Sequence, residues 1–387
     1  MRVLITTPSG WGHLQPMMPL ANALQRHGHE VRWATGPDSC GWVNAAGVHA
    51  VAAGVEQQAL LKALADPSPN VRRLPRAAVP DHMFGPIFGG LAASEMLTDL
   101  WPIAADWAPD LVIHDAAEFA GPIIAAKIGV PSICKSFGML LPAHRVASAA
   151  EHAGDLWRSV GIDPPPFGGC YEHLYLDICP AALQPTLPSY IPHRQSLRPL
   201  SHDNIAAESG SPDADWPSTF PIVYLTLGTV FISLDLLRDA VTALADIGVG
   251  ILVTVGSRVD PTEMGPQPGH VRVERYIPQS LVLSRCRVVV SHGGSGTSFA
   301  ALSHGLPQLC LPQGADQFLN SAAITRAGAG LQLITEMIDP VAIANAVDRL
   351  LNEQSFQSAA GTVAAEISQM PHPDQVADVL GRPPFGA

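Results

Sequence analysis

A strand–turn–helix segment between residues 288 and 299 carries the residue types that bind phosphate groups. The apolar run Val288–Ser291 predicts a buried strand, and the glycine-rich run His292–Thr297 predicts a turn that leads into a helix near Gly296. Glycines let an anion approach the backbone closely, and the free N–H groups and dipole of a helix start favour negative charge. The side chains of this turn add hydrogen-bond donors: His292, Ser295 and Thr297. The segment therefore predicts a diphosphate cradle that needs no net positive charge; a tight turn without a ligand is the alternative.

An aspartate–glutamine pair, Asp316 and Gln317, follows this turn after about one helix and one strand. In a doubly wound parallel sheet, that spacing places the pair at the carboxyl end of the neighbouring strand, facing the same crevice as His292. The two side chains offer the acceptors and donors that sugar hydroxyls need. Asp316 could instead cap the following helix, and the two roles are compatible.

A histidine and an aspartate at two other expected strand ends suit a catalytic base and its partner. His13 follows the first expected strand in a glycine-containing turn, and Asp115 ends the expected strand Asp110–His114. Histidine can accept a proton near neutral pH, and a carboxylate can fix its tautomer and stabilise the imidazolium. Asp115 could also cap the next helix. Glu118 is the alternative carboxylate, and His114 is expected to turn into the sheet packing.

Short apolar runs alternate with helical patterns and predict the elements that must position these residues. The expected strands are Val3–Thr7, Glu30–Ala34, Asp110–His114, Ser132–Lys135, Ile222–Leu227, Gly250–Val255, Val271–Glu274, Arg287–Ser291 and Gln308–Leu311. They predict an α/β protein with two Rossmann-like, doubly wound parallel-sheet domains that face each other across a cleft.

The first expected helix places its apolar residues on one face and ends before a glycine. This face comprises Leu14, Met17, Ala21 and Leu24, with the stop at Gly28. Pro16 suits the first turn of such a helix, whereas Pro19 predicts an irregular start.

The chain has 387 residues, which suits two domains. We expect an N-terminal acceptor-binding domain over residues 1–195, a linker over 196–220, a donor-binding domain over 221–370, and a tail over 371–387 that crosses back to the first domain. Eight prolines from Pro180 to Pro221 indicate an extended linker with short ordered turns.

Composition excludes several classes of function. The formal net charge of −12 disfavours nucleic acid as a partner, and no apolar stretch is long enough for a membrane span. With no signal peptide expected and six scattered cysteines expected to be reduced, the interpretation is a cytoplasmic protein. Asp213-Ala214-Asp215 has the form of a metal-binding motif but lies in the proline-rich stretch, so we interpret it as a solvated acidic turn and expect no metal.

One segment, from about Gln57 to Asp106, does not fit the alternation of strands and helices and is rich in Pro, Gly, Met and Phe. Large apolar residues with loop-forming neighbours suggest an adaptable wall that binds a hydrophobic acceptor; ordinary helical packing is an equal alternative. The residues expected to contact the acceptor are Met83, Phe84, Phe88, Phe137 and Met139.

Four motifs together resemble those of the GT-B-fold glycosyltransferases of family 1, in particular the actinobacterial branch that decorates natural products of the calicheamicin, macrolide and polyketide types. They are Gly12-His13-x-x-Pro16, Arg275-Tyr276-Ile277-Pro278-Gln279, His292-Gly-Gly-Ser-Gly-Thr297 and Asp316-Gln317. Their order and spacing match over essentially the whole chain.

This resemblance implies roles for individual residues. It implies that His13 and Asp115 form the catalytic dyad. We expect no metal or bound cofactor besides the nucleotide-sugar co-substrate, because the helix start near Gly296 offers an alternative to a metal. The implied donor-binding residues are Thr229, Tyr276, Ile277, Gln279, His292, Gly294, Ser295, Gly296, Thr297, Asp316 and Gln317. The implied reaction is transfer of a sugar, often a deoxysugar, from a thymidine or uridine diphosphate to a small hydrophobic aglycone. Because no separate carboxylate nucleophile is evident, we expect a single displacement that inverts the anomeric centre.

The sequence is also compatible with two other functions. A sugar-nucleotide epimerase would share the donor pocket but need no large apolar acceptor wall, and a non-catalytic transferase-like partner could activate a true enzyme. A dinucleotide oxidoreductase is disfavoured because no G-x-G-x-x-G follows the first strand. A homodimer is also left open.

Overall fold

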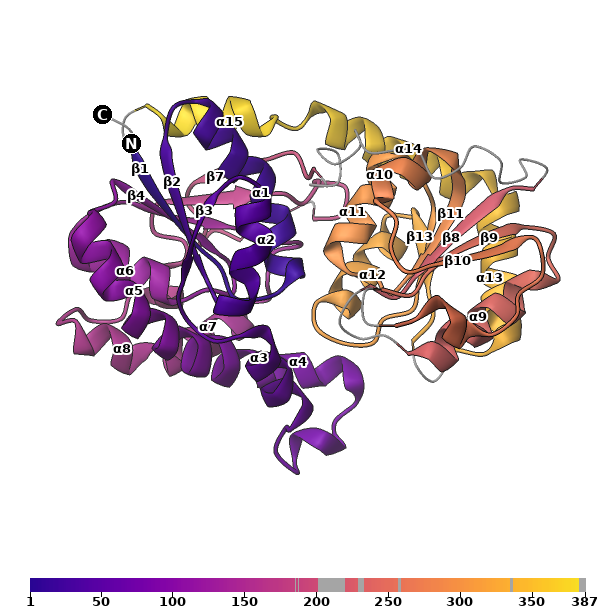
Figure 1. Ribbon diagram of the computed structural model, residues 1–387, viewed down its shortest axis with the longest axis horizontal. Coiled ribbons are helices and arrows are strands. Elements are labelled where there is room, and N and C mark those ends of the chain that lie inside the picture. Colours follow the sequence, from indigo (N-terminus) through magenta and orange to yellow (C-terminus); the bar gives the residue numbers. More distant parts are fainter. Residues whose placement is uncertain are drawn as a thin grey trace. The chain divides into compact units, whose positions relative to one another are not determined.

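The computed structural model describes residues 1–184, 186, 188–200, 220–228, 233–256, 259–334 and 337–382, which form two compact units. Unit 1 contains the described residues of 1–179, 186–198 and 370–382, and unit 2 contains those of 180–184 and 199–369. Each unit has its own parallel sheet (Figure 1). Two features singled out in the sequence, Thr229 and Asp213-Ala214-Asp215, lie outside the described residues.

Unit 1 is built on a parallel sheet with the strand order β3-β2-β1-β4-β5-β6-β7. The strands are β1 Arg2–Thr6, β2 Glu30–Thr35, β3 His49–Ala52, β4 Leu111–Asp115, β5 Ser132–Lys135, β6 Leu174–Asp177 and β7 Arg194–Ser196. The inner strands β1 and β4 are almost wholly buried, as a sheet covered on both faces requires. Thr6 pairs with His114 in the register of these two strands, so the turns that follow them start side by side.

Ten helices of the described part of the chain surround this sheet, together with short 3₁₀ turns. They are α1 Trp11–Arg26, α2 Cys40–Ala45, α3 Gln57–Ala65, α4 Val79–Phe84, the π-helix η4 Gly85–Ala92, α5 Ala93–Trp107, α6 Ala120–Ile128, α7 Ala143–His152, α8 Gly154–Ser159 and α15 Pro373–Leu380. The last of these, α15, packs on α1, as Figure 1 shows.

The start of α1 differs from the sequence-based prediction. The helix begins at Trp11, so Pro16 and Pro19 both lie inside it rather than at its start. Each proline lacks the N–H that a helix interior uses. Burial of Leu14 and Met17 anchors this part of the helix against the unit despite the missing hydrogen bonds.

The segment from Gln57 to Asp106 is largely helical, in line with the packing alternative. Its centre is the π-helix η4, which is wider than an α-helix and occurs often at functional sites. A Cβ atom added at Gly85 or Gly89 would lie 2.2 Å or 2.0 Å from Ser148 Oγ and the Ala149 carbonyl oxygen, respectively. These two glycines therefore allow η4 to pack closely on α7.

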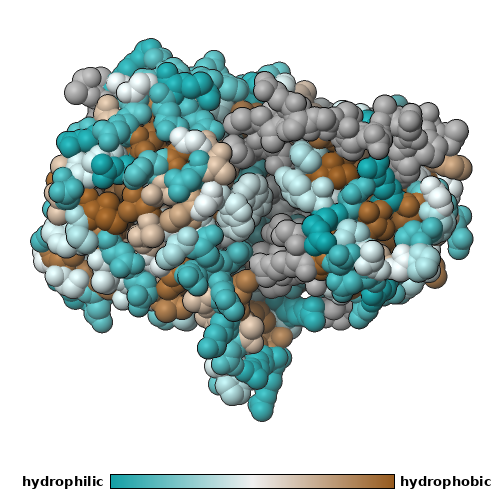
Figure 2. Space-filling view, in the orientation of Figure 1, coloured by the Kyte–Doolittle hydropathy of each residue, from teal (hydrophilic) through white to brown (hydrophobic). Residues whose placement is uncertain are grey.

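A stretch between α3 and α4, residues 66–78, projects from unit 1. Its residues are mostly exposed, and its surface is mainly hydrophilic in Figure 2. It carries Arg72, Arg73 and Arg76, which gather positive charge locally on an acidic chain.

Unit 2 is built on a second parallel sheet with the order β10-β9-β8-β11-β12-β13. Its strands are β8 Ile222–Thr226, β9 Gly250–Thr254, β10 Val271–Glu274, β11 Cys286–Ser291, β12 Gln308–Cys310 and β13 Gly330–Gln332. Its helices are α9 Leu234–Ala245, α10 Gln279–Val282, α11 Ser295–Ser303, α12 Gln317–Arg326, α13 Pro340–Asn352 and α14 Gln354–Gln369. Val223 and Leu225 of β8 pack with α9 and α13, whereas Ile222 and Tyr224 join a separate cluster, so both faces of the sheet are covered.

Most strands of the two sheets lie where the sequence predicts them. The expected strands are all present, within a residue or so at their ends. The described residues form four more strands that were not predicted: β3, β6, β7 and β13. Of these, β7 lies inside the proline-rich stretch that was interpreted as an extended linker, so that interpretation is wrong for Arg194–Ser196. All six cysteines are free thiols, as expected. No helix among the described residues is long and apolar enough to cross a membrane.

The close approach of η4 to α7 makes a stability prediction. Gly89→Ala should lower the free energy of unfolding by about 1–3 kcal/mol, because the new methyl group overlaps backbone atoms of Ala149 that cannot rotate away. Gly90→Ala is the matched control, since the nearest atom to its added Cβ is 3.9 Å away. Urea unfolding of the two variants measures the difference. Equal stabilities would contradict the packing described.

Candidate active site

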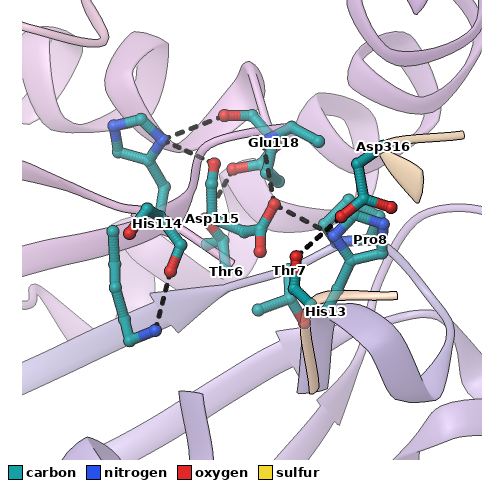
Figure 3. Close-up of polar contacts among 12 residues, drawn as sticks. Thr6, Thr7, Pro8, His13, His114, Asp115, Glu118 and Asp316 are labelled. Atoms are coloured by element: carbon teal, nitrogen blue, oxygen red, sulfur yellow. Dashed lines mark hydrogen bonds and ion pairs between the residues drawn. The ribbon is translucent and has the colours of Figure 1, made fainter. Parts of the chain in front are cut away.

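A histidine–aspartate pair lies at the carboxyl end of the sheet in unit 1 (Figure 3). His13 is in the first turn of α1 and Asp115 ends β4, and the His13 Nδ1–Asp115 Oδ1 distance is 3.1 Å. The carboxylate accepts, so Nδ1 carries the proton and Nε2 is the nitrogen that can take another. The aspartate side chain is 2% exposed and that of the histidine 19%, which leaves the base reachable and its partner shielded.

Asp115 also holds the turn that follows it. Its Oδ1 accepts a hydrogen bond of 2.8 Å from the backbone N–H of Ala117, so the local structural role and the contact with His13 coexist. Glu118, the alternative carboxylate, is used differently. Its oxygens accept from the Thr6 hydroxyl and from the N–H groups of Ala120 and Gly121 at the start of α6, and burial raises its pKa. Asp115 is therefore the carboxylate that contacts His13.

His114 points into the sheet packing, as predicted. It is fully buried, and its Nδ1 donates to the carbonyl oxygens of Asp115 and Glu118. Burial lowers the pKa of His114 to about 4, although the two backbone hydrogen bonds oppose this shift. The side chain is neutral at physiological pH and acts as a brace for the turn.

A buried lysine beside Asp115 was not found from the sequence. Lys135 ends β5, is the register partner of Asp115 and is 1% exposed. Its Nζ donates to the Ser136 carbonyl oxygen at 2.9 Å. Burial lowers the pKa of Lys135 to about 8, while Asp115 opposes the shift, so the lysine is still largely cationic at neutral pH. This charge compensates the buried carboxylate.

Two phenylalanine rings lie beside His13. The ring of Phe137 lies 4.8 Å from that of His13 and the ring of Phe88 lies 5.9 Å from it, measured between centroids. Both phenylalanines are partly exposed. Phe84 contacts Phe88 but is itself buried. Of the five residues expected to contact an acceptor, Phe88 and Phe137 lie next to the base.

The other two expected acceptor residues are Met139, which is buried, and Met83, which is partly buried like Phe88. Met139 is 8% exposed, and Met83 packs with a small cluster around Leu60 and Ile87. Phe88 packs against the same cluster as Met83, and a direct contact of either methionine with an acceptor remains a prediction.

In unit 2, the glycine-rich turn leads into α11 as predicted. Gly293 has φ 80°, a left-handed conformation that favours glycine, and Gly294 precedes the first helical residue, Ser295. No side chain caps this helix start, and Gly296 in its first turn is exposed. The N–H groups of the first turn are thus directed to a position where an anion would be favourable.

His292 lies against this turn. Burial lowers the pKa of His292 to about 4, with the carboxylate of Asp316 opposing the shift. The ring is neutral at physiological pH, so it can donate a hydrogen bond to a phosphate but brings no positive charge. The backbone after β8 passes close to the His292 ring. A Cβ atom on Gly228 would lie 2.5 Å from this ring, so only a glycine fits at that position.

Asp316 occupies the position before α12, but its side chain makes no capping hydrogen bond. Its Oδ2 accepts instead from Ser295 Oγ at 2.7 Å and from Asn320 Nδ2 at 2.8 Å. The preceding residue, Ala315, has φ 53°, which costs about 1 kcal/mol for a residue with a Cβ atom. The helix-cap alternative for this side chain is therefore wrong, and the carboxylate is turned to the glycine-rich turn.

Gln317 has a different environment from its neighbour. It is 4% exposed, and its Oε1 accepts from the N–H groups of Gln313 and Gly314 at 2.7 Å and 3.0 Å. Its side-chain oxygen thereby holds the turn that presents Asp316. A sugar contact at Gln317 remains a prediction.

The expected nucleoside-binding segment before α10 offers one exposed ring. Tyr276 is 55% exposed, whereas the Ile277 side chain is buried in the core, so any contact of Ile277 with a base would come from its backbone. Gln279 Nε2 donates to Thr297 Oγ1 at 3.0 Å, which ties this segment to the first turn of α11.

Comparison with known proteins identifies the family. The family models of the erythromycin biosynthesis protein CIII-like N-terminal and C-terminal domains match residues 22–167 and 238–382. An L-demethylnoviosyl transferase of Streptomyces niveus is 32% identical over 98% of this chain and 97% of its own length. The elloramycin glycosyltransferase ElmGT of Streptomyces olivaceus is 32% identical over 97% of this chain and 96% of its own. The chain belongs to the actinobacterial natural-product branch of the family 1 glycosyltransferases.

The solved structures agree with this family. The spinosyn rhamnosyltransferase SpnG, complexed with thymidine diphosphate, is similar with a TM-score of 0.83 and 25% identity, over 99% of this chain and 100% of that one. The fold is GT-B, with two Rossmann-like parallel-sheet domains, and the protein is a nucleotide-sugar-dependent glycosyltransferase. Within the described ranges, no three His, Cys, Asp or Glu side chains are grouped so that they could hold a metal ion.

The depressed pKa of His114 gives this glycosyltransferase a pH-dependent stability. Between pH 4 and pH 6.5 the unfolded chain binds a proton at this histidine that the folded chain does not, so lowering the pH through this range destabilises the fold. His114→Asn keeps a donor but removes the titration. The pH dependence of its free energy of unfolding should be smaller by up to about 1.4 kcal/mol per pH unit. Urea unfolding at pH 4.5 to 7 measures this; a wild-type slope in the variant would contradict it.

Proposed function

We propose that this chain is an inverting glycosyltransferase that moves a sugar, typically a deoxysugar, from its thymidine or uridine diphosphate to a small hydrophobic natural-product aglycone. The observation that supports it most directly is the hydrogen bond between His13 Nδ1 and Asp115 Oδ1, next to two partly exposed phenylalanines. A base, a fixed tautomer and an apolar surface beside it suit an acceptor that must be deprotonated as it reacts.

The proposed reaction is a single displacement. His13 Nε2 takes the proton of the acceptor nucleophile, and the freed electron pair forms a bond to the anomeric carbon. The bond from that carbon to the diphosphate oxygen breaks, and the nucleoside diphosphate leaves with its electron pair. Asp115 stabilises the imidazolium that forms, as a carboxylate does in a catalytic triad. One displacement inverts the anomeric centre.

We propose that the donor lies on unit 2. The N–H groups at the start of α11, with His292, Ser295 and Thr297, would bind the diphosphate, because a helix start stabilises the charge that develops on the leaving group. Asp316 and Gln317 would bind sugar hydroxyls, and Tyr276 to Gln279 would line the nucleoside pocket. Thr229 is expected to approach the donor as well. The bound thymidine diphosphate of the similar SpnG structure supports thymidine as the nucleoside of the donor.

The role proposed for His13 gives the first prediction of activity. His13→Ala should lower kcat by roughly 10²- to 10⁴-fold, the contribution of a general base. Its affinity for thymidine diphosphate should stay at the wild-type value, since the proposed nucleotide site lies on the other unit. Single-turnover kinetics and calorimetry measure the two quantities. An equal loss of nucleotide affinity would mean that His13 supports the structure instead.

The reaction itself is tested by the product. Purified protein would be incubated with an aromatic polyketide acceptor and with matched thymidine diphosphate and uridine diphosphate sugars. We expect transfer from the thymidine nucleotide to be the faster, and an anomeric configuration in the product opposite to that of the donor, read from the proton coupling constant in NMR spectra. Retention of configuration would rule out the single displacement, and faster transfer from the uridine nucleotide would reverse the choice of base.

A further inference from the structure

Asn320 in α12 connects the glycine-rich turn with the Asp316 carboxylate, and neither the motifs nor the expected site residues include it. The side chain is 2% exposed. Its Nδ2 lies 2.9 Å from the Gly293 carbonyl oxygen, 3.0 Å from Ser295 Oγ and 2.8 Å from Asp316 Oδ2. One amide nitrogen thus reaches the turn after β11, the first residue of α11 and the residue before α12.

The chemistry of these neighbours fixes the orientation of the amide. The Gly293 carbonyl and the Asp316 carboxylate can only accept hydrogen bonds, so the NH₂ group must face them and the amide oxygen must point away. That oxygen is buried and has no partner among the described residues. A buried amide oxygen without a hydrogen-bond partner costs free energy, whereas an apolar side chain at the same position would carry no such cost. The hydrogen bonds made by Nδ2 must therefore offset it.

Two donors converge on the same oxygen of Asp316. Ser295 Oγ and Asn320 Nδ2 both reach Oδ2, which sets the plane of the carboxylate relative to α11. Ser295 is itself in contact with Asn320, so the three side chains form one closed set of hydrogen bonds. The carboxylate cannot turn without breaking two of them.

We infer that Asn320 is a positioning residue that aims the Asp316 carboxylate at the donor sugar. This inference rests on the proposed function, because it takes Asp316 as the group that binds the sugar. Its consequence is specific: loss of Asn320 should impair recognition of the sugar part of the donor more than recognition of the nucleotide part.

A double-mutant cycle tests this inference. The variants are Asn320→Ala, Asp316→Ala and both together, assayed for kcat/KM with the nucleotide sugar and for the dissociation constants of the nucleotide sugar and of thymidine diphosphate. Asn320→Ala alone should lower kcat/KM by about 10- to 100-fold, the size expected for lost hydrogen bonds to a charged group. In the Asp316→Ala background the same change should cost less than about threefold, because its effect passes through Asp316. The affinity for thymidine diphosphate should change by less than about threefold.

The chain offers a matched control. Asn352 Nδ2 donates to Asp348 Oδ1 at 2.8 Å with the same four-residue spacing on α13, but both residues are exposed. Asn352→Ala removes an equivalent asparagine–aspartate contact and should leave all three measured quantities unchanged. Asn320→Asp, of the same shape, should be no more active than Asn320→Ala near neutral pH, because it sets a second carboxylate against Asp316.

The outcomes separate this inference from the proposed function. Wild-type protein that neither binds nor uses a nucleotide sugar would overturn the proposed function and this inference with it. Active wild-type protein with equal fold losses in both backgrounds, or with equal losses of affinity for the sugar nucleotide and the bare nucleotide, would overturn the role of Asn320 alone. A lower melting temperature of Asn320→Ala with unchanged kinetics would do the same and leave only a structural role.

Discussion

The parallel register of β1 and β4 is the constraint on which the proposed chemistry depends. Because Thr6 pairs with His114, the turns after these strands start at the same level, although His13 and Asp115 are 102 residues apart in the chain. A shift of either strand would separate the imidazole from its carboxylate. The buried contacts of Glu118 and His114 hold the second turn, and Lys135 balances its charge. These buried polar contacts thus help to hold the Asp115 carboxylate where it accepts the hydrogen bond from His13.

In unit 2, the electrostatic problem is how an acidic chain can bind an anionic donor. The chain has a formal net charge of −12, yet the family to which it belongs uses nucleoside diphosphate sugars as donors. His292 is neutral, so the anion would be held by the N–H groups of α11 and by neutral donors rather than by cations. A nearby carboxylate, Asp316, would oppose the anion. Hydrogen bonds from Ser295 and Asn320 to one of its oxygens spread that negative charge and make its presence beside the turn less costly.

The sequence predicted those parts of the fold in which local and tertiary preferences agree. Continuous apolar runs such as those of β8 and β11 were found because both faces of these strands are buried. The strands β7 and β13 have three residues each and carry polar side chains, so no periodicity reveals them. The π-helix η4 was equally hidden, since it combines glycines and a proline that normally indicate a loop, and only its packing on α7 makes those glycines necessary.

In the candidate site, too, the sequence revealed the residues that have a local signal and missed a residue that has almost none. His13, His292 and Asp316 were found because each follows an apolar strand, and several lie beside glycines that a ligand-binding turn needs. Asn320 contacts other protein groups, and its only sequence signal is its place four residues after Asp316. That signal is ambiguous within this very chain, because Asp348 and Asn352 repeat the spacing on an exposed helix face. Sequence spacing predicts which side chains can form a contact. Whether that contact holds a functional group in place depends on burial, and burial is set by the packing of the whole folded unit.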